Sequence, residues 1–178
     1  LRIEPSALQA AGAPVTANVV AGSSVNLASN GVRGATISGG GAPVNSDPDY
    51  GGENQNRITD HYGTDRGGYS NLAGDFQGTV ADAPWATVGG GRNNSASGSG
   101  AVVGGGAEGF ASGSFATIAG GFQNRSTAQH AAVAGGNRNS AVGTESSVAG
   151  GSANDARGLR SFIAGGSFNC AGADFSFA

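Results

Sequence analysis

The chain has 178 residues, of which 35 are glycine, and its 12 acidic and nine basic residues give a formal net charge of −3. All nine basic residues are arginines spread along the chain, which excludes a basic patch for nucleic acid, and no apolar run reaches membrane-spanning length. Such a glycine content is typical of disordered chains, but valine and isoleucine recur at a fixed interval, which predicts an ordered repeat.

Three segments follow one another along the chain. Residues 1–18 are predicted to form an arm or a joint to a neighbouring module. Residues 19–85 are predicted to form irregular coils with inserted loops, and residues 86–178 are predicted to form regular repeats. The single cysteine, Cys170, cannot form a disulfide within the chain, and we interpret it as a small buried residue or a wall residue of the repeat.

Two insertions interrupt the irregular part. The run APVNSDPDYGGENQ, residues 42–55, is rich in turn formers and breaks the pattern. The pattern resumes with Asp65 at a position where valine is expected, and Asp65 and Val88 lie 23 positions apart, eight more than one repeat. The excess around DFQGTVADAPW is predicted to bulge out as a second loop. Repeat proteins usually place insertions on one face, so both loops are expected on the same face.

The repeat is clearest from residue 86, where ATVGGGRNNSASGSG is followed by AVVGGGAEGFASGSF and ATIAGGFQNRSTAQH. An apolar residue precedes each glycine pair at intervals of 15, at Val88, Val103, Ile118, Val133, Val148 and Ile163. Six positions after each of these comes a second row, with glycine at position 109 and asparagine at Asn94, Asn124, Asn139, Asn154 and Asn169. Constrained and variable positions alternate, which predicts strands, and the glycines predict turns with positive φ between them.

These features predict an all-β fold, a parallel β-solenoid of coils of about 15 residues. Each strand would pair with its copy one coil further on, about 4.8 Å away. Equivalent side chains would then form interior rows, and the stacked asparagine amides are expected to bond to one another along the axis.

A single coil stack of this kind has little apolar interior. Burial of one valine or isoleucine and two alanine-sized residues per coil, at about 25 cal/mol per Å², hardly matches an ordering cost of roughly 1.5 kcal/mol per residue. Association of several chains would bury one wall of each, so a symmetric homo-oligomer is expected, with three chains as the natural solution for a fibre.

Units such as ATVGGGRNNSASGSG and SSVAGGSANDARG resemble the YadA-like head repeats of trimeric autotransporter adhesins. They also resemble the related GGG-type repeats of bacterial surface fibres and phage tail-fibre-like proteins. The resemblance covers about residues 19–178. It implies a left-handed parallel β-roll, with three rolls packed side by side into a rod.

The inserted loops are the candidates for a recognition surface. Their candidate binding residues are Asp47, Tyr50, His61, Tyr62 and Trp85. The competing interpretation is that these polar loops are simply solvated and that the aromatic side chains plug the open end of the roll.

The first loop also contains candidate metal ligands. The run DPDYGGEN starts with the Asp-x-Asp pattern and glycine bend of a calcium-binding loop, and its candidate ligands are Asp47, Asp49 and Glu53. The remaining ligands of such a loop are missing at the required spacing, so we interpret these side chains as solvated carboxylates. His61 lies beside Asp60 without a nucleophile motif or a second positioned acid, and the GGG runs lack the Lys-Ser/Thr of a phosphate loop. No enzymatic activity and no cofactor are therefore expected.

The expected function is that of a structural or adhesive segment in an extracellular, secreted or cell-surface fibre. Its partners would be further copies of the chain and a host or surface receptor or glycan. The alternative is a phage tail-fibre-like shaft for host recognition. An ice-binding solenoid is disfavoured because the row containing Thr87, Val102 and Thr117 is irregular. A polysaccharide-acting solenoid is disfavoured because the acidic residues lie mostly in loops.

Overall fold

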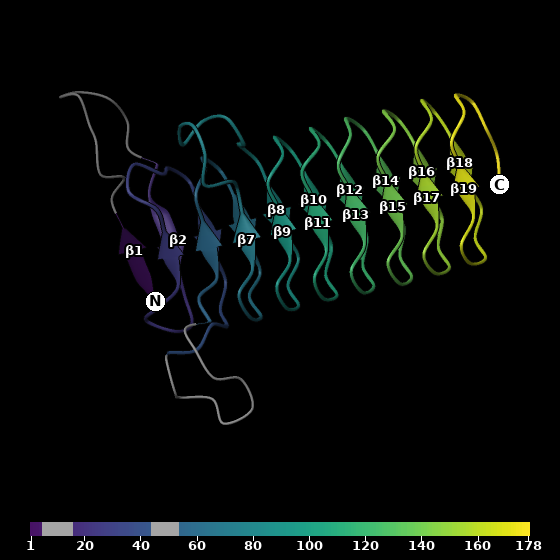
Figure 1. The fold of residues 1–178 in the computed structure, drawn as a ribbon. Helices are drawn as coiled ribbons and strands as arrows, with labels where there is room; N and C mark the ends of the chain where they lie inside the picture. The colour runs from purple at the N-terminus through teal and green to yellow at the C-terminus, as the bar shows by residue number, and fades with distance from the viewer. Residues whose placement is uncertain (5–15, 44–53) are drawn as a thin grey trace.

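The computed structural model describes residues 1–4, 16–43 and 54–178, which wind into an elongated β-solenoid of two facing sheets (Figure 1). The first sheet, called sheet A, contains β1 (Arg2–Glu4), β2 (Asn18–Val20), β4 (Thr36–Ile37), β6 (Thr64–Asp65), β8 (Thr87–Val88), β10 (Val102–Val103), β12 (Thr117–Ile118), β14 (Ala132–Val133), β16 (Ser147–Val148) and β18 (Phe162–Ile163). The second, sheet B, contains β3 (Leu27–Ala28), β5 (Arg57–Ile58), β7 (Leu72–Ala73), β9 (Ser95–Ala96), β11 (Phe110–Ala111), β13 (Arg125–Ser126), β15 (Ser140–Ala141), β17 (Asp155–Ala156) and β19 (Cys170–Ala171). No helix occurs among these described residues.

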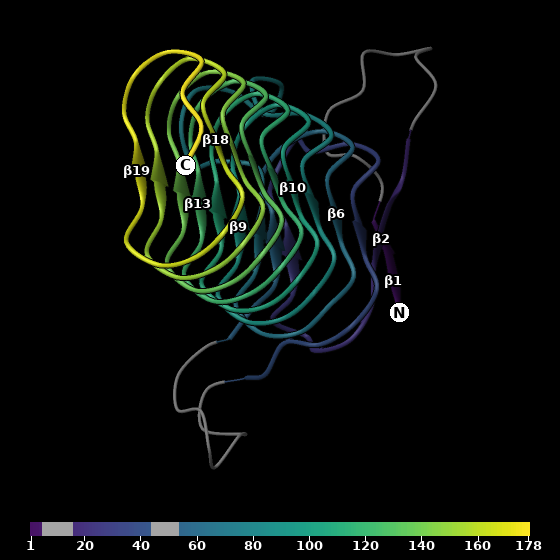
Figure 2. The same ribbon diagram turned by 90° about the vertical axis from the view of Figure 1, so that its right-hand side faces the viewer.

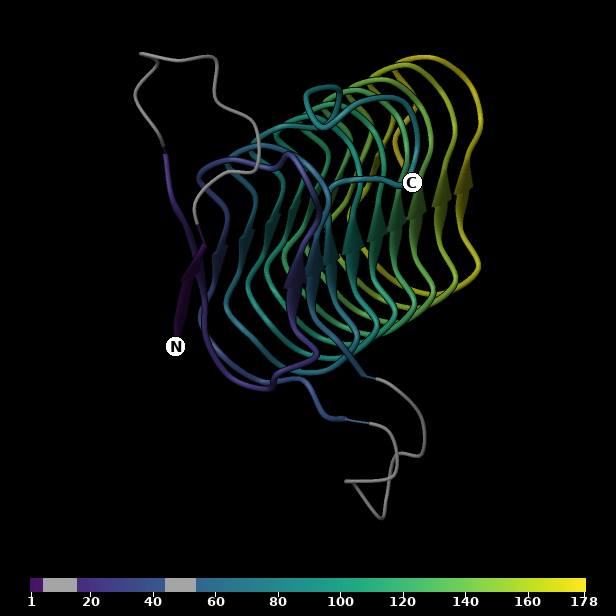
Figure 3. The ribbon, with the colours of Figure 1, turned by 90° about the vertical axis from the view of Figure 1, so that its left-hand side faces the viewer.

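Successive strands of each sheet pair in parallel and in register. Val103 lies beside Val88 of the preceding coil and Ile118 of the following coil, and the other regular coils repeat this offset. Successive coils therefore follow the same outline when the stack is viewed obliquely along its length (Figures 2 and 3). The prediction of a parallel β-solenoid with coils of about 15 residues is confirmed.

The N-terminal edge of sheet A ends differently from the rest. Strand β1 pairs antiparallel with β2, so that Ile3 lies opposite Val19. The N–H and C=O groups along that edge of β2 are therefore paired by a reversed strand. Such a strand blunts an edge that would otherwise be open to another chain.

The interior is narrow and is filled by small side chains. The valines and isoleucines of the apolar row are at most 1% exposed, as are the alanines and serines two residues earlier. On sheet B a second buried row consists of Ala96, Ala111, Ser126, Ala141, Ala156 and Ala171. The period of two that predicted strands thus corresponds to inward and outward positions.

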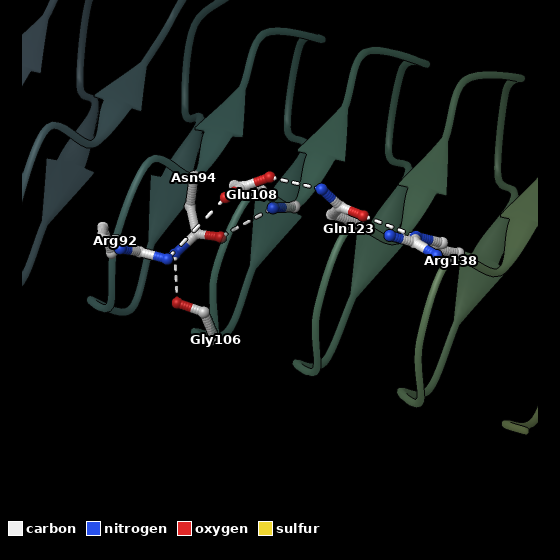
Figure 4. Close-up of polar contacts among 7 residues, drawn as sticks. Arg92, Asn94, Gly106, Glu108, Gln123 and Arg138 are labelled. Carbon is white, nitrogen blue, oxygen red and sulfur yellow. Dashed lines mark hydrogen bonds and ion pairs between the residues drawn. The ribbon is translucent and has the colours of Figure 1, made fainter. Parts of the chain in front are cut away.

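The asparagine row links the coils through the backbone. Nδ2 of Asn139 donates to the carbonyl oxygen of Gly135 in its own coil (2.8 Å) and of Gly151 in the next coil (2.9 Å). Its Oδ1 accepts a bond from the backbone N–H of Asn154 (3.1 Å). Figure 4 shows the equivalent bond between Asn94 and the Gly106 carbonyl.

The expected amide–amide contacts are a minor part of this row. They occur between Asn154 and Asn139 and between Asn169 and Asn154, each at 3.1 Å. All the asparagine amides of the regular coils also bind carbonyl groups of the glycine turns, and the carbonyl in the next coil, such as that of Gly151, accepts a backbone N–H as well. A fully bonded buried amide avoids the cost of burying a polar group alone.

Each regular coil turns its corners with residues of positive φ. One row of non-glycine residues precedes the asparagines and comprises Asn93, Glu108, Gln123, Arg138, Ala153 and Phe168. The other lies at the opposite edge and comprises Trp85, Phe115, His130, Glu145, Arg160 and Phe175; we call it the tip row. In both rows the backbone N–H donates to the preceding coil, as from Phe115 to the Ser99 carbonyl (2.9 Å), whereas strand N–H groups donate to the following coil.

Steric contact between neighbouring coils explains why one position in each glycine run must be glycine. Gly91 has φ of +90°, and a Cβ added there would collide with the carbonyl oxygen of Gly106 in the next coil. The same approach recurs one coil further on, between Gly106 and Gly121. The last glycine of each run is therefore required because neighbouring turns stack backbone on backbone.

The two insertions leave the solenoid at opposite edges, which corrects the expectation of a shared face. Ala42 and Asn54 bridge each other at the base of the first insertion, in the turn that leads from sheet A to sheet B. Residues 74–85 lie in the turn that leads from β7 of sheet B to β8 of sheet A. Turns of these two kinds alternate along the chain and lie at opposite ends of the strands.

We predict that Asn139→Ala lowers the free energy of unfolding by about 2–3 kcal/mol, because it removes bonds to three backbone groups in the interior. Urea denaturation followed by circular dichroism measures this change. The matched control is Ser140→Ala, whose side chain faces outward from the next position and should alter stability by less than about 0.5 kcal/mol. Equal effects of the two substitutions would show that the asparagine row does not hold the coils together.

Candidate functional site

The insertion of residues 74–85 is tied to the solenoid by the buried carboxylate of Asp60. Its Oδ2 accepts bonds from the backbone N–H of Asp75 (2.9 Å) and from Oγ1 of Thr59 (3.1 Å). Its Oδ1 accepts a bond from the backbone N–H of Ala83 (3.2 Å). Burial raises the pKa of the Asp60 carboxyl, and these hydrogen bonds oppose that rise. Asp60 therefore fixes both ends of the insertion.

Three carboxylates meet at this point. Asp60, Asp75 and Asp82 each place an oxygen within 4.8 Å of the others, and oxygen ligands of this type suit a calcium ion. The Asp82 carboxylate also accepts a bond from the backbone N–H of Thr79 (3.1 Å). The described contacts of Asp60 and Asp82 thus serve to shape the loop.

The metal candidates from the sequence, Asp47, Asp49 and Glu53, lie outside the described residues, as does Tyr50.

His61 packs against an arginine from the preceding coil. Its Nδ1 accepts a bond from the backbone N–H of Arg33 (3.2 Å), and its Nε2 lies 3.2 Å from Nη2 of the same residue. Burial, followed by the positive charge of Arg33, lowers the pKa of His61, although Asp60 opposes the shift. Because the side chain is only 8% exposed and pairs with Arg33, it has a structural role at this corner.

Tyr62 and Trp85 stand next to each other at the same edge. Both have positive φ, and the backbone N–H of Trp85 donates to the His61 carbonyl (3.0 Å). Tyr62 is 45% exposed and Trp85 is 58% exposed, so both present large aromatic surfaces to solvent. The structure thus brings together three of the sequence candidates, because the His61 ring lies edge-on to that of Tyr62 at 6.0 Å between centroids and the His61 carbonyl accepts the N–H of Trp85.

The tip row continues this aromatic edge along the rod. The rings of Phe115 and His130 stack at 5.4 Å between centroids. Further along, Glu145 forms an ion pair with Arg160 (2.7 Å), whose guanidinium lies 5.9 Å from the centroid of the Phe175 ring. At the opposite edge Gln123 bonds to Glu108 (2.7 Å) and to Arg138 (2.8 Å), as Figure 4 shows. Side chains at 15-residue spacing therefore contact one another on the surface as well as in the interior.

Sequence reasoning missed Phe76 in the insertion. Its side chain is 68% exposed, and it lines three neighbouring depressions on the outer face of sheet B. Its signal in the sequence is weak because it lies outside the repeat, in a loop whose path depends on Asp60. The tip row, by contrast, follows the repeat length from Trp85 onward and could have been found by extending the same register.

Asp65 is the one acidic residue of the apolar row among the described coils. It pairs with Ile37 and Val88 and is fully buried. Its Oδ1 accepts a bond from the backbone N–H of Gly67 (2.8 Å), whereas its Oδ2 is buried without a hydrogen-bond partner. Burial raises the pKa of the Asp65 carboxyl to about 7. An ionisable group thus enters the core in the coil that precedes the second insertion.

No protein-family model matches this chain, and no curated protein matches it. Within residues 1–4, 16–43 and 54–178, no helix is both long enough and apolar enough to cross a membrane. The repeat units and the arrangement of their side chains are therefore the basis for a functional proposal.

We predict that the solenoid loses stability as pH rises from about 4 to about 7, because the folded state holds the Asp65 proton that the unfolded state has released. Asp65→Val should flatten this slope and raise the melting temperature most at pH 8. The measurement is thermal unfolding at several pH values.

Ile37→Val is the matched control for Asp65→Val, because it changes the neighbouring position of the same row without a titratable group. It should shift the melting temperature by similar amounts at every pH. An unchanged slope in Asp65→Val would contradict the assignment of this pH dependence to Asp65.

Proposed function

We propose that this chain is a rigid segment of an extracellular fibre, built from three copies wound as left-handed β-rolls and packed side by side. The observation that carries the proposal is the outer face of sheet A in the regular coils, which combines regular register with uncharged and mostly small side chains. The proposal is structural rather than enzymatic.

Rigidity is supported by the way the coils are joined. Every regular coil is connected to the next by parallel strand pairs and by the turn bridges, and the asparagine row adds further bonds at the same offset except at Gly109, which has no side chain. Contacts of this kind extend the stack without a flexible link between units. A rod of this type suits a spacer that keeps its ends apart.

Association is supported by the chemistry of the sheet A face. Its outward strand positions in the regular coils are Thr87, Val102, Thr117, Ala132, Ser147 and Phe162, and none is charged. The positions two residues further on are Gly89, Gly104, Ala119, Ala134, Ala149 and Ala164. Small side chains permit close approach of another chain, and burial of this face would add apolar contact that the narrow interior lacks. The outer row of sheet B, by contrast, contains Arg125 and Asp155.

The corner aromatics support an adhesive role for the same fibre. Tyr62 and Trp85 lie at the corner beside the second insertion, two residues before the outward positions Thr64 and Thr87 of sheet A, and both side chains are exposed. Three chains would present each such surface three times around one axis. Weak contacts with a surface receptor or glycan would then gain avidity.

Sedimentation equilibrium should give three times the chain mass of 17.1 kDa. Thr117→Arg places a charge on the sheet A face and should shift the mass towards that of one chain. Ser140→Arg, at an outward position of sheet B, should leave the mass unchanged. A folded wild-type chain with the mass of one or two copies would contradict the three-chain proposal. Dissociation by Ser140→Arg but not by Thr117→Arg would show that the chains associate through sheet B and not through sheet A.

A further inference from the structure

A cleft lies between two phenylalanine rings on the outer face of sheet B. It has a volume of about 190 Å³ and is lined by Leu72, Asp75, Phe76, Gln77, Ser95, Ser97 and Phe110. Phe110 belongs to strand β11, whereas Phe76 stands on the second insertion just after strand β7. The cleft therefore exists only where the insertion adds a wall to the regular face.

The strand spacing sets the length of the floor of this cleft. Leu72, Ser95 and Phe110 occupy equivalent positions on the adjacent strands β7, β9 and β11. Neighbouring strands lie about 4.8 Å apart, so the backbones at Leu72 and Phe110 are separated by roughly 10 Å. The floor of the cleft, from Leu72 to Phe110, is therefore long enough for one flat ring.

Each phenylalanine already has an arginine on the side away from the cleft. The guanidinium of Arg57 lies 5.3 Å from the centroid of the Phe76 ring, and that of Arg125 lies 5.2 Å from the centroid of the Phe110 ring. Arg57 comes from strand β5 and Arg125 from β13, which flank the strands of the cleft. Arg57 and Arg125 disfavour a cationic ligand between the rings, and the Asp75 carboxylate of the cleft disfavours an anionic one, so the charges favour a neutral ligand.

The polar groups of the cleft match a ligand with several hydroxyls. Ser95, Ser97 and the amide of Gln77 can each donate and accept hydrogen bonds, and Asp75 adds a carboxylate acceptor. A sugar ring has an apolar C–H face for an aromatic ring and hydroxyls at its edge for such groups. We propose that the cleft between Phe76 and Phe110 binds one neutral sugar ring of a glycan.

This assignment rests on the proposed function of the chain as a surface fibre, and it names the ligand class and the place where that ligand binds. One such cleft occurs on the described part of each chain, because residues 74–85 build its wall. A single small cleft gives weak binding, and presentation on several chains of one fibre raises the overall affinity. Asp60, which fixes both ends of the insertion, is then a positioning residue for Phe76.

The test is saturation-transfer NMR on the full chain with lactose, cellobiose, N,N′-diacetylchitobiose and α-mannobiose at millimolar concentration. At least one disaccharide should receive saturation, mainly at C–H protons of one ring face. Phe76→Ala and Phe110→Ala should each weaken its binding at least about tenfold, since each removes an aromatic wall. Phe122→Ala, at the turn outside the cleft, is the matched control and should leave binding unchanged.

Three results would overturn the proposal: no saturation of any disaccharide, equal binding by Phe76→Ala, or binding of tetramethylammonium in place of the sugars. A fall in sedimentation mass in Phe76→Ala would also overturn it, because the cleft would then be covered by a second copy. The two proposals fail separately, since a single chain that binds sugar refutes only the three-chain rod, and a three-chain rod without sugar binding refutes only the cleft.

Discussion

The structure depends on one constraint, namely that the hydrogen-bonding groups of each coil must lie directly opposite their partners in the next coil. Asn139 shows how this is met, because its amide binds its own turn, the following turn and the following asparagine together. A coil with one residue more or fewer between strands would move these groups out of register. The interior is too small to correct such a shift by apolar packing, so the polar row carries the specificity of the stack.

The positive-φ corners follow from the same constraint. A coil must reverse direction within a few residues at each edge, and the reversed peptide finds its partner in the preceding coil. Non-glycine residues at these corners adopt a conformation that costs about 1 kcal/mol or more each. Stacked pairs such as Phe115 with His130, and Glu145 with Arg160, supply contacts that offset part of this cost. The edges of the rod are thus rows of touching side chains.

Departures from the repeat coincide with the candidate functional features. Asp65 replaces an apolar residue, the second insertion follows within the same coil, and Asp60 ties that insertion down. Insertions are tolerated there because they leave the strands before and after them in register, as Leu72 and Ser95 show. A uniform shaft can in this way carry one distinct surface without loss of its stacking.

The spacing of Val88, Val103 and Ile118 was enough to predict the strands, the turns and the inward rows, because period two and a constant offset leave few ways to bury these residues. The position of Asp65 in the apolar row was likewise predicted from register alone. The bonding of the asparagines to backbone carbonyls was not, since it depends on turn conformation. The edges from which the insertions leave, and the pairing of Phe76 with Phe110, depend on loop paths that the repeat does not encode.

The central claim is that the strands stack at a constant offset and that the insertions lie outside this stack. Spin labels on the native Cys170 and on an outward residue of sheet B test it directly by dipolar spectroscopy, with excess unlabelled chain to suppress contacts between copies. Labels at Ser95→Cys and Leu72→Cys should give distances to Cys170 of about 24 and about 29 Å, one strand spacing apart although 23 residues separate the two sites. Equal distances, or a difference of two spacings or more, would contradict the account.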